Sequence, residues 1–136
     1  MGMYNTILVT LDCSDIDRVI IDQVIELAKI HHSQVNLVHV LHSHTLDQKA
    51  FMLGDAQKRI QGYEQLFKDA GIPVNVIIKI GEPEEEILNV IDQGQYDLIA
   101  MATHGHQKFL DFLYGSVSDT LKHKIDIPIL LIRGKK

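Results

Sequence analysis

The chain has 136 residues, of which 46% are apolar and 23% are charged, a balance that is ordinary for one globular domain and excludes disordered and fibrous classes. Its 13 Lys and Arg residues against 18 Asp and Glu residues give a formal net charge of −5, which excludes the broad basic surface of a general nucleic-acid binder. The single cysteine, Cys13, excludes an internal disulfide framework, and no apolar run approaches the roughly 20 residues of a membrane span. We therefore expect one cytoplasmic domain over residues 1–136.

The first half of the chain predicts two strands and two helices. Residues 6–11 form a β-branched, apolar run, and Ser14 is placed to cap a helix whose apolar residues recur at spacings of three and four over residues 16–28. Residues 35–41 repeat the strand pattern. Residues 41–54 are the least regular part of the chain, and a second helical stripe over residues 53–70 ends at Gly71 and Pro73.

The second half continues the same alternation. A strand over residues 74–80 precedes a helix that starts at Pro83 and has three glutamates in its first turn. A fourth strand over 97–101 and a fourth helical stripe over 117–125 follow, and Pro128 suits an edge position for the last strand, 127–132. Because most strands are apolar throughout, this order predicts a Rossmann-like α/β fold, a five-stranded parallel sheet with helices on both faces.

The fold itself indicates where a ligand would bind. In an open parallel sheet, ligands bind beyond the carboxyl ends of the strands, where the strand order reverses, which singles out residues 12–14, 41–44 and 102–118. In the last of these segments Gly105 follows a strand and Gly115–Ser116 opens a helix, whose unpaired N–H groups and positive end suit a phosphate. An ordinary glycine turn and an ordinary helix start explain the same residues, so local sequence leaves both interpretations open.

Taken together, these segments resemble the universal stress protein family in its small, single-domain form. The family's nucleotide loop is Gly-x-x-Gly, nine residues, then Gly-Ser or Gly-Thr, and this chain has Ala102-x-x-Gly105, nine residues, then Gly115-Ser116. The resemblance extends over the whole chain, through the Asp-x-Ser at residues 12–14, the strand at 37–40, the Gly-x-Pro at 81–83, the strand and loop at 97–105 and the last strand at 128–132. It implies the adenine nucleotide alpha hydrolase-like form of the fold.

The resemblance also implies a function, an ATP-binding regulatory or sensor module of the stress response, with Mg²⁺ accompanying the nucleotide. Asp12 would contact the ribose or adenine side, and the backbone of Val40 would contact the adenine edge. The residues expected to wrap the ribose and the phosphates are Ala102, Gly105, Gly115, Ser116, Val117 and Ser118.

The family commonly forms homodimers through the last strand, here Ile129, Leu130, Leu131 and Ile132. A physical argument supports this dimer independently, because an edge strand must protect its unpaired backbone groups, and pairing with its own copy does so. A covering tail would serve the same purpose.

Two departures from the family's pattern keep a second function open. Ala102 replaces the first glycine, which matters if the backbone there needs a positive φ, and Lys108 stands where many ATP-binding members have a small residue. The alternative is an ATP-independent dimeric interaction module whose cleft is closed. Slow ATP hydrolysis is a third idea, but no catalytic base can be identified, so no catalytic residue is assigned and the enzymatic status is left open.

Histidines and Cys13 supply the remaining candidates. His42 and His44 would share one side of an extended segment, as two metal ligands do, but no cysteine or carboxylate cluster completes a site, so we expect no bound metal. His104 and His106 flank Gly105 and would contact phosphates or line the loop. Cys13 is expected to fill space beside the cleft, since a redox-sensing thiol needs exposure and a lowered pKa.

Overall fold

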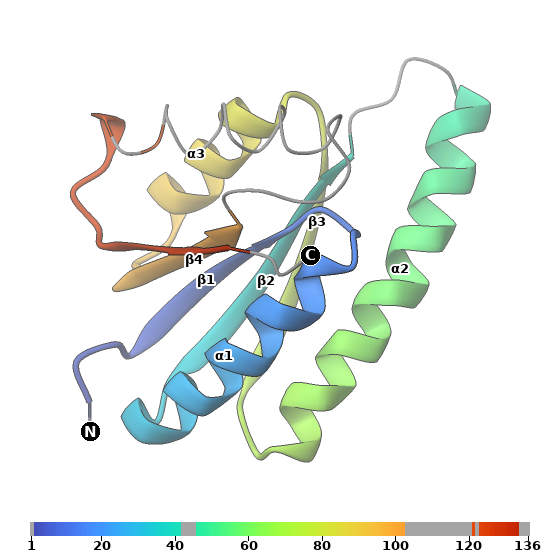
Figure 1. Ribbon diagram of the computed structural model, residues 1–136. Coiled ribbons are helices and arrows are strands. Elements are labelled where there is room, and N and C mark those ends of the chain that lie inside the picture. Colours follow the sequence, from blue (N-terminus) through green and yellow to red (C-terminus); the bar gives the residue numbers. More distant parts are fainter. Residues whose placement is uncertain (1, 42–45, 103–120, 122, 134–136) are drawn as a thin grey trace.

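The computed structural model describes residues 2–41, 46–102, 121 and 123–133 (Figure 1). The strands are β1 (Thr6–Leu11), β2 (Gln34–Leu41), β3 (Val74–Ile80), β4 (Leu98–Ala102) and β5 (Ile129–Ile132), and the helices are α1 (Ile16–His31), α2 (Leu46–Asp69) and α3 (Pro83–Gln93). All five strands are parallel and lie in the order β3-β2-β1-β4-β5. The predicted α/β fold is therefore confirmed.

Each face of the sheet carries its own core. Side chains alternate along a strand, so Val9 of β1 packs with α1 and α2, whereas Leu8 packs with α3. Figure 1 shows α1 and α2 on one side of the sheet and α3 on the other. The three inner strands, β1, β2 and β4, are apolar almost throughout because both of their faces are buried.

The boundaries of the helices differ from the sequence prediction in two places. Ser14 was expected to cap α1, but Asp15 occupies the cap position and the Ser14 hydroxyl has no hydrogen-bond partner. The expected irregular stretch after β2 was wrong from residue 46 onward, because α2 begins at Leu46. That part of α2 has a weak apolar stripe, but its Leu, Gln, Lys, Ala and Met residues are good helix formers.

The ends of α3 follow the sequence signals. Pro83 lies in the first turn of α3, where no intrahelical donor is lost, and the turn is acidic. Glu82 precedes it with an extended backbone, and Gly94 ends the helix. In the described part of the chain, no helix combines the length and the apolar content needed to cross a membrane.

Candidate functional site

The sheet brings three of the predicted site residues together at the carboxyl ends of its strands. Asp12 directly follows β1, Val40 is the penultimate residue of β2, and Ala102 is the last residue of β4. β1 lies between β2 and β4, and the chain builds the sheet outward in opposite directions from this point, so β1 and β4 flank the topological switch. The predicted Gly105, Gly115, Ser116, Val117 and Ser118 lie outside the described residues, as do His42, His44, His104, His106 and Lys108.

Val40 and Ala102 both have backbone that suits the proposed roles. The Leu41 carbonyl oxygen accepts a hydrogen bond from the backbone N–H of Gly81, which directly follows β3. The carbonyl group of the neighbouring Val40 therefore points the opposite way, toward β1. The β1–β2 register ends one residue earlier, at Leu11 and His39. Ala102 is paired with Ile132 within the extended strand β4. The sequence-based concern that Ala102 needs a positive φ is therefore removed.

The loop after β1 is held by the side chain of Asp17, in the first turn of α1. Its carboxyl oxygens accept hydrogen bonds from the backbone N–H of Asp12 (3.1 Å) and of Cys13 (2.8 Å). Cys13 has φ of 64°, a left-handed conformation that a non-glycine residue adopts only where its surroundings enforce it. Asp12 Oδ1 in turn accepts the N–H of Ser14 at 2.9 Å. These bonds fix the position of the Asp12 carboxylate at the end of β1.

Asp17 is itself buried, with 1% of its surface exposed. Burial and the neighbouring Asp12 carboxylate raise the pKa of Asp17 to about 8, although the two backbone N–H donors act in the opposite direction. The sequence prediction missed this residue. The sequence does carry a signal for it, because Asp17 is a charged residue on the apolar face of α1, next to Ile16.

Cys13 forms a hydrogen bond with a histidine that is distant in sequence. His39 Nδ1 lies 2.8 Å from the Leu11 carbonyl oxygen, and since a carbonyl only accepts, Nδ1 carries the proton and Nε2 is the acceptor. Cys13 Sγ lies 3.6 Å from that Nε2. Burial raises the pKa of Cys13 to about 12 and lowers the pKa of His39. Both groups are therefore neutral, which fits the expected space-filling role of Cys13 and not a reactive thiolate.

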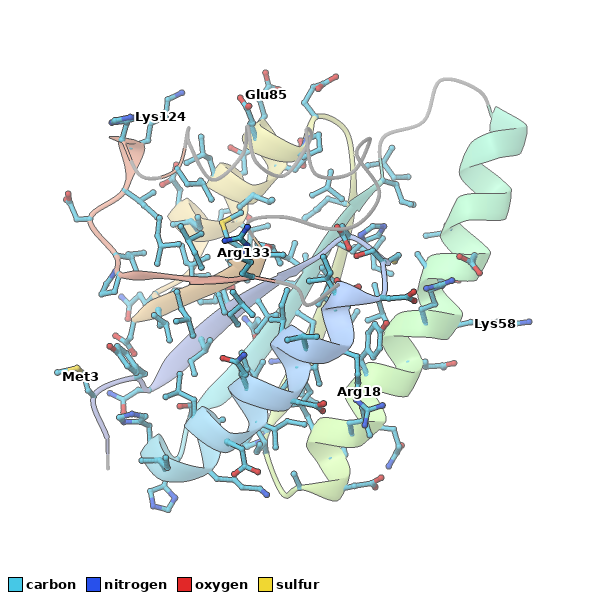
Figure 2. The ribbon with its side chains drawn as sticks, viewed as in Figure 1. Met3, Arg18, Lys58, Glu85, Lys124 and Arg133 are labelled. Carbon is cyan, nitrogen blue, oxygen red and sulfur yellow. The ribbon has the colours of Figure 1, made fainter. Side chains whose placement is uncertain are left out.

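Helix α2 contributes a cation to this end of the sheet. Arg59 donates from Nη1 to the carbonyl oxygen of Cys13 (2.9 Å), and its Nε lies 3.5 Å from Asp55 Oδ2. Figure 2 shows the adjacent Lys58 pointing away from the sheet into solvent. Tyr63, one turn further along α2, has its pKa raised by burial and by the charge of Asp17. The β1–α1 loop is thus held from both α1 and α2.

The described residues contain no group of three or more His, Cys, Asp or Glu side chains that could hold a metal ion. His39, which the sequence places near His42 and His44, has its two ring nitrogens occupied by Leu11 and Cys13. Neither ring nitrogen of His39 is therefore free to bind a metal ion.

Comparison with known proteins identifies the family. The family model described as "Universal stress protein family" matches residues 3–133. The chain belongs to the universal stress protein family. The universal stress protein MJ0577 of Methanocaldococcus jannaschii is 24% identical over 157 aligned residues, covering 98% of this chain and 97% of the relative. The solved structure of MJ0577 superimposes with a TM-score of 0.84 and covers 98% of this chain and 99% of its own.

Two other solved structures of universal stress proteins share the fold and contain nucleotides. One, described in complex with cAMP, has a TM-score of 0.73 at 17% identity and covers 97% of this chain and 98% of its own. The other, from Archaeoglobus fulgidus in complex with dAMP, has a TM-score of 0.71 at 19% identity and covers 96% and 98%. Some structural relatives of this chain therefore bind adenine nucleotides.

Proposed function

We propose that this universal stress protein binds ATP at the carboxyl ends of β1, β2 and β4 and acts as a regulatory or sensor module. The observation that carries the proposal is the convergence of Asp12, Val40 and Ala102 at the topological switch of a parallel sheet. The binding of cAMP and dAMP by two structural relatives supports an adenine nucleotide as the ligand.

Each described residue has a role that its geometry allows. The Asp12 carboxylate, oriented by Ser14 and by the bonds that Asp17 accepts, would accept hydrogen bonds from ribose hydroxyls or from the adenine side. The Val40 carbonyl, directed toward β1, would accept from the adenine amino group. Ala102 would let the following segment begin close to the ribose, since its side chain is a single methyl group.

The phosphates would be held by Gly105, Gly115, Ser116, Val117 and Ser118 through backbone N–H groups and hydroxyls. Magnesium would arrive bound to the phosphate oxygens, where it neutralises their charge. Contact of residues 105–115 with the nucleotide would change the surface that a protein partner contacts. We place this activity in the cytoplasm, in keeping with the free thiol of Cys13.

The deciding measurement is equilibrium titration of the full chain with ATP in the presence of magnesium. We expect saturable binding with a dissociation constant below the millimolar range. Absence of such binding would contradict the proposal and favour the alternative, an ATP-independent dimeric interaction module with a closed cleft.

The double substitution Ala102→Gly with Lys108→Gly separates these two functions. If the native cleft is open, the double variant binds ATP within about threefold of the wild type, since Ala102 is extended and carries no backbone strain. If only the double variant binds, the native cleft is closed. Following inorganic phosphate release in the same samples tests for slow hydrolysis.

We also propose that the chain forms a homodimer through β5. This strand is at one edge of the described sheet, and Leu131 has 47% of its surface exposed there. Pairing Ile129, Leu130, Leu131 and Ile132 with a second copy would satisfy the outer backbone groups of the strand.

A further inference from the structure

The outer edge of β3 carries backbone groups that no described strand uses, since β3 pairs with β2 alone among those strands. At the start of this pair, the Val35 N–H donates to the Pro73 carbonyl oxygen. At its end, the Gly81 N–H donates to the Leu41 carbonyl oxygen. Both backbone groups of a strand residue point to the same side, so the odd-numbered residues of β3 face β2. The residues whose N–H and C=O groups face outward are therefore Val74, Val76, Ile78 and Ile80.

A groove runs along this same edge. The side chains of Val76 and Ile78 pack against the core that α2 covers, and they line one wall of the groove. Glutamines and charged residues of α2 line the other wall. The groove has a volume of about 620 Å³, which is within the range of ligand-binding pockets. A Cβ atom on Gly54, at the rim, would meet nothing within 4 Å, so the helix leaves open space beside the strand.

Together, the edge and the groove specify the conformation of a partner. An extended chain lying along β3 has backbone groups at every second residue that match those facing outward from the strand. Its alternate side chains would point into the groove, where Val76 and Ile78 favour aliphatic groups. A helix could not use the edge in this way, because its backbone groups already bond one another.

The charges beside the groove favour an acidic partner. Glu64 lines the groove, but its carboxylate lies 3.6 Å from the Lys68 ammonium group. Lys58 also lines the groove, and Figure 2 shows it extending outward into solvent. The two lysines outnumber the glutamate, so this wall carries an excess positive charge. A carboxylate on the partner can reach the Lys58 ammonium group at the rim.

We propose that the β3 edge and its groove are a docking surface for an extended segment of another protein. This segment adds a strand to the sheet, inserts alternate aliphatic side chains into the groove and places an acidic residue beside Lys58. The surface is at the opposite edge of the described sheet from β5. It uses none of the residues that we assign to the nucleotide, so docking does not depend on the proposed ATP binding.

Selection from a displayed library of random decapeptides against the full chain tests this proposal. We expect the selected peptides to alternate aliphatic residues with others and to include Asp or Glu. Synthetic copies of one selected peptide, each N-methylated at a single position, are then titrated by fluorescence anisotropy. N-methylation should weaken binding by about fivefold or more at every second position, where the N–H bonds β3, and by less than about twofold between them.

Two variants of the protein locate the binding site. Lys58→Glu should weaken binding of the selected peptide by about three- to tenfold, because an attraction at the rim becomes a repulsion. Lys29→Glu makes the same change of charge on α1, at an exposed position outside the groove, and should bind within about twofold of the wild type.

Three results would overturn the proposal. Sensitivity to N-methylation without a period of two would exclude strand addition. An equal loss of affinity in Lys58→Glu and Lys29→Glu would exclude this groove as the site. Failure to select any binding peptide would exclude an extended partner. If Ile80→Lys then also lowers the oligomeric state seen by sedimentation velocity, the edge pairs with a second copy of the chain instead.

Discussion

At the scale of single residues, Asp17 connects the fold with the site. A carboxyl group inside the first turn of α1 is buried, yet it organises the loop that carries Asp12. Asp17 also supports the left-handed backbone of Cys13, because it accepts the hydrogen bond from the N–H of that residue. Removing the Asp17 carboxyl group is therefore expected to affect both stability and the placement of Asp12.

The first prediction concerns the pH dependence of stability. Asp17 has a pKa raised from 3.8 to about 8, so the folded state holds a proton that the unfolded state has released. The stability that this proton contributes is present at low pH and is lost as the pH rises toward 8, with a slope of up to about 1.4 kcal/mol per pH unit. Asp17→Asn removes the titrating group and should flatten the profile.

Denaturant unfolding between pH 6.5 and 8 measures this slope. His39 has its pKa lowered in the folded chain and still takes up a proton near pH 6.5 when unfolded, but Asp17→Asn keeps His39, so the difference between the two profiles isolates Asp17. Burial raises the pKa of Cys13 to about 12, so folded Cys13 keeps its proton throughout this window. Asp15→Asn is the matched control, since Asp15 is exposed and lies two residues away. A wild-type profile no steeper than that of Asp17→Asn would contradict the assignment.

At the scale of elements, the two edges of the sheet differ in how they are used. β3 is flanked by α2, with Gly54, Gln57, Gln61 and other α2 residues lining a groove beside Val76 and Ile78. β5 has four residues, of which only the last, Ile132, is buried. An edge strand with exposed apolar side chains is open to pairing with another chain, and β5 shows that pattern.

The second prediction tests the β5 interface. Leu131→Lys places a charge in each copy where the two strands would pair, and it should weaken dimerisation at least roughly tenfold through like-charge repulsion and desolvation. Sedimentation velocity at several protein concentrations would show a shift from dimer to monomer.

Ile30→Lys provides the control for this experiment. Ile30 is 70% exposed, more than Leu131, but lies near the end of α1 and outside β5. It should leave the dimer intact. A wild type that sediments as a monomer, or an equal loss of dimer in both variants, would rule out β5 as the interface.

At the scale of the whole molecule, one sheet joins two separate cores. The larger core contains Val9 and Phe67, and the smaller contains Leu8 and Ile87. Because adjacent residues of β1 belong to different cores, neither core can open without disturbing the strand that the other needs. The chain is therefore expected to unfold as one cooperative unit.

The third prediction compares the two cores. Phe67→Ala and Ile87→Ala each remove a side chain that is 0% exposed, and each should lower the free energy of unfolding by about 2–5 kcal/mol. Both variants should still show one transition, seen together by far-UV circular dichroism and by tyrosine fluorescence. Ile80→Ala, at a position 48% exposed, is the control and should cost less than about 1 kcal/mol. Separate transitions for the two cores would contradict the cooperative unit.

The sequence by itself determined the fold class and the order of the described strands and helices along the chain, and it predicted a ligand site at the carboxyl ends of the strands. These depend on local patterns, namely apolar runs at 6–11 and 35–41 and helical spacing at 16–28, which each segment carries without its neighbours. The family motif was visible for the same reason.

Only the tertiary structure decided how the site is held. His39 meets Cys13 across 26 positions of sequence, and Arg59 reaches Cys13 across 46. The buried hydroxyl of Thr10 has no hydrogen-bond partner, and the backbone of Ala102 is extended. Both features depend on which strands lie beside β1 and β4. Contacts of this kind arise because the crossovers bring distant strand ends together, and no local pattern records which side chains then meet.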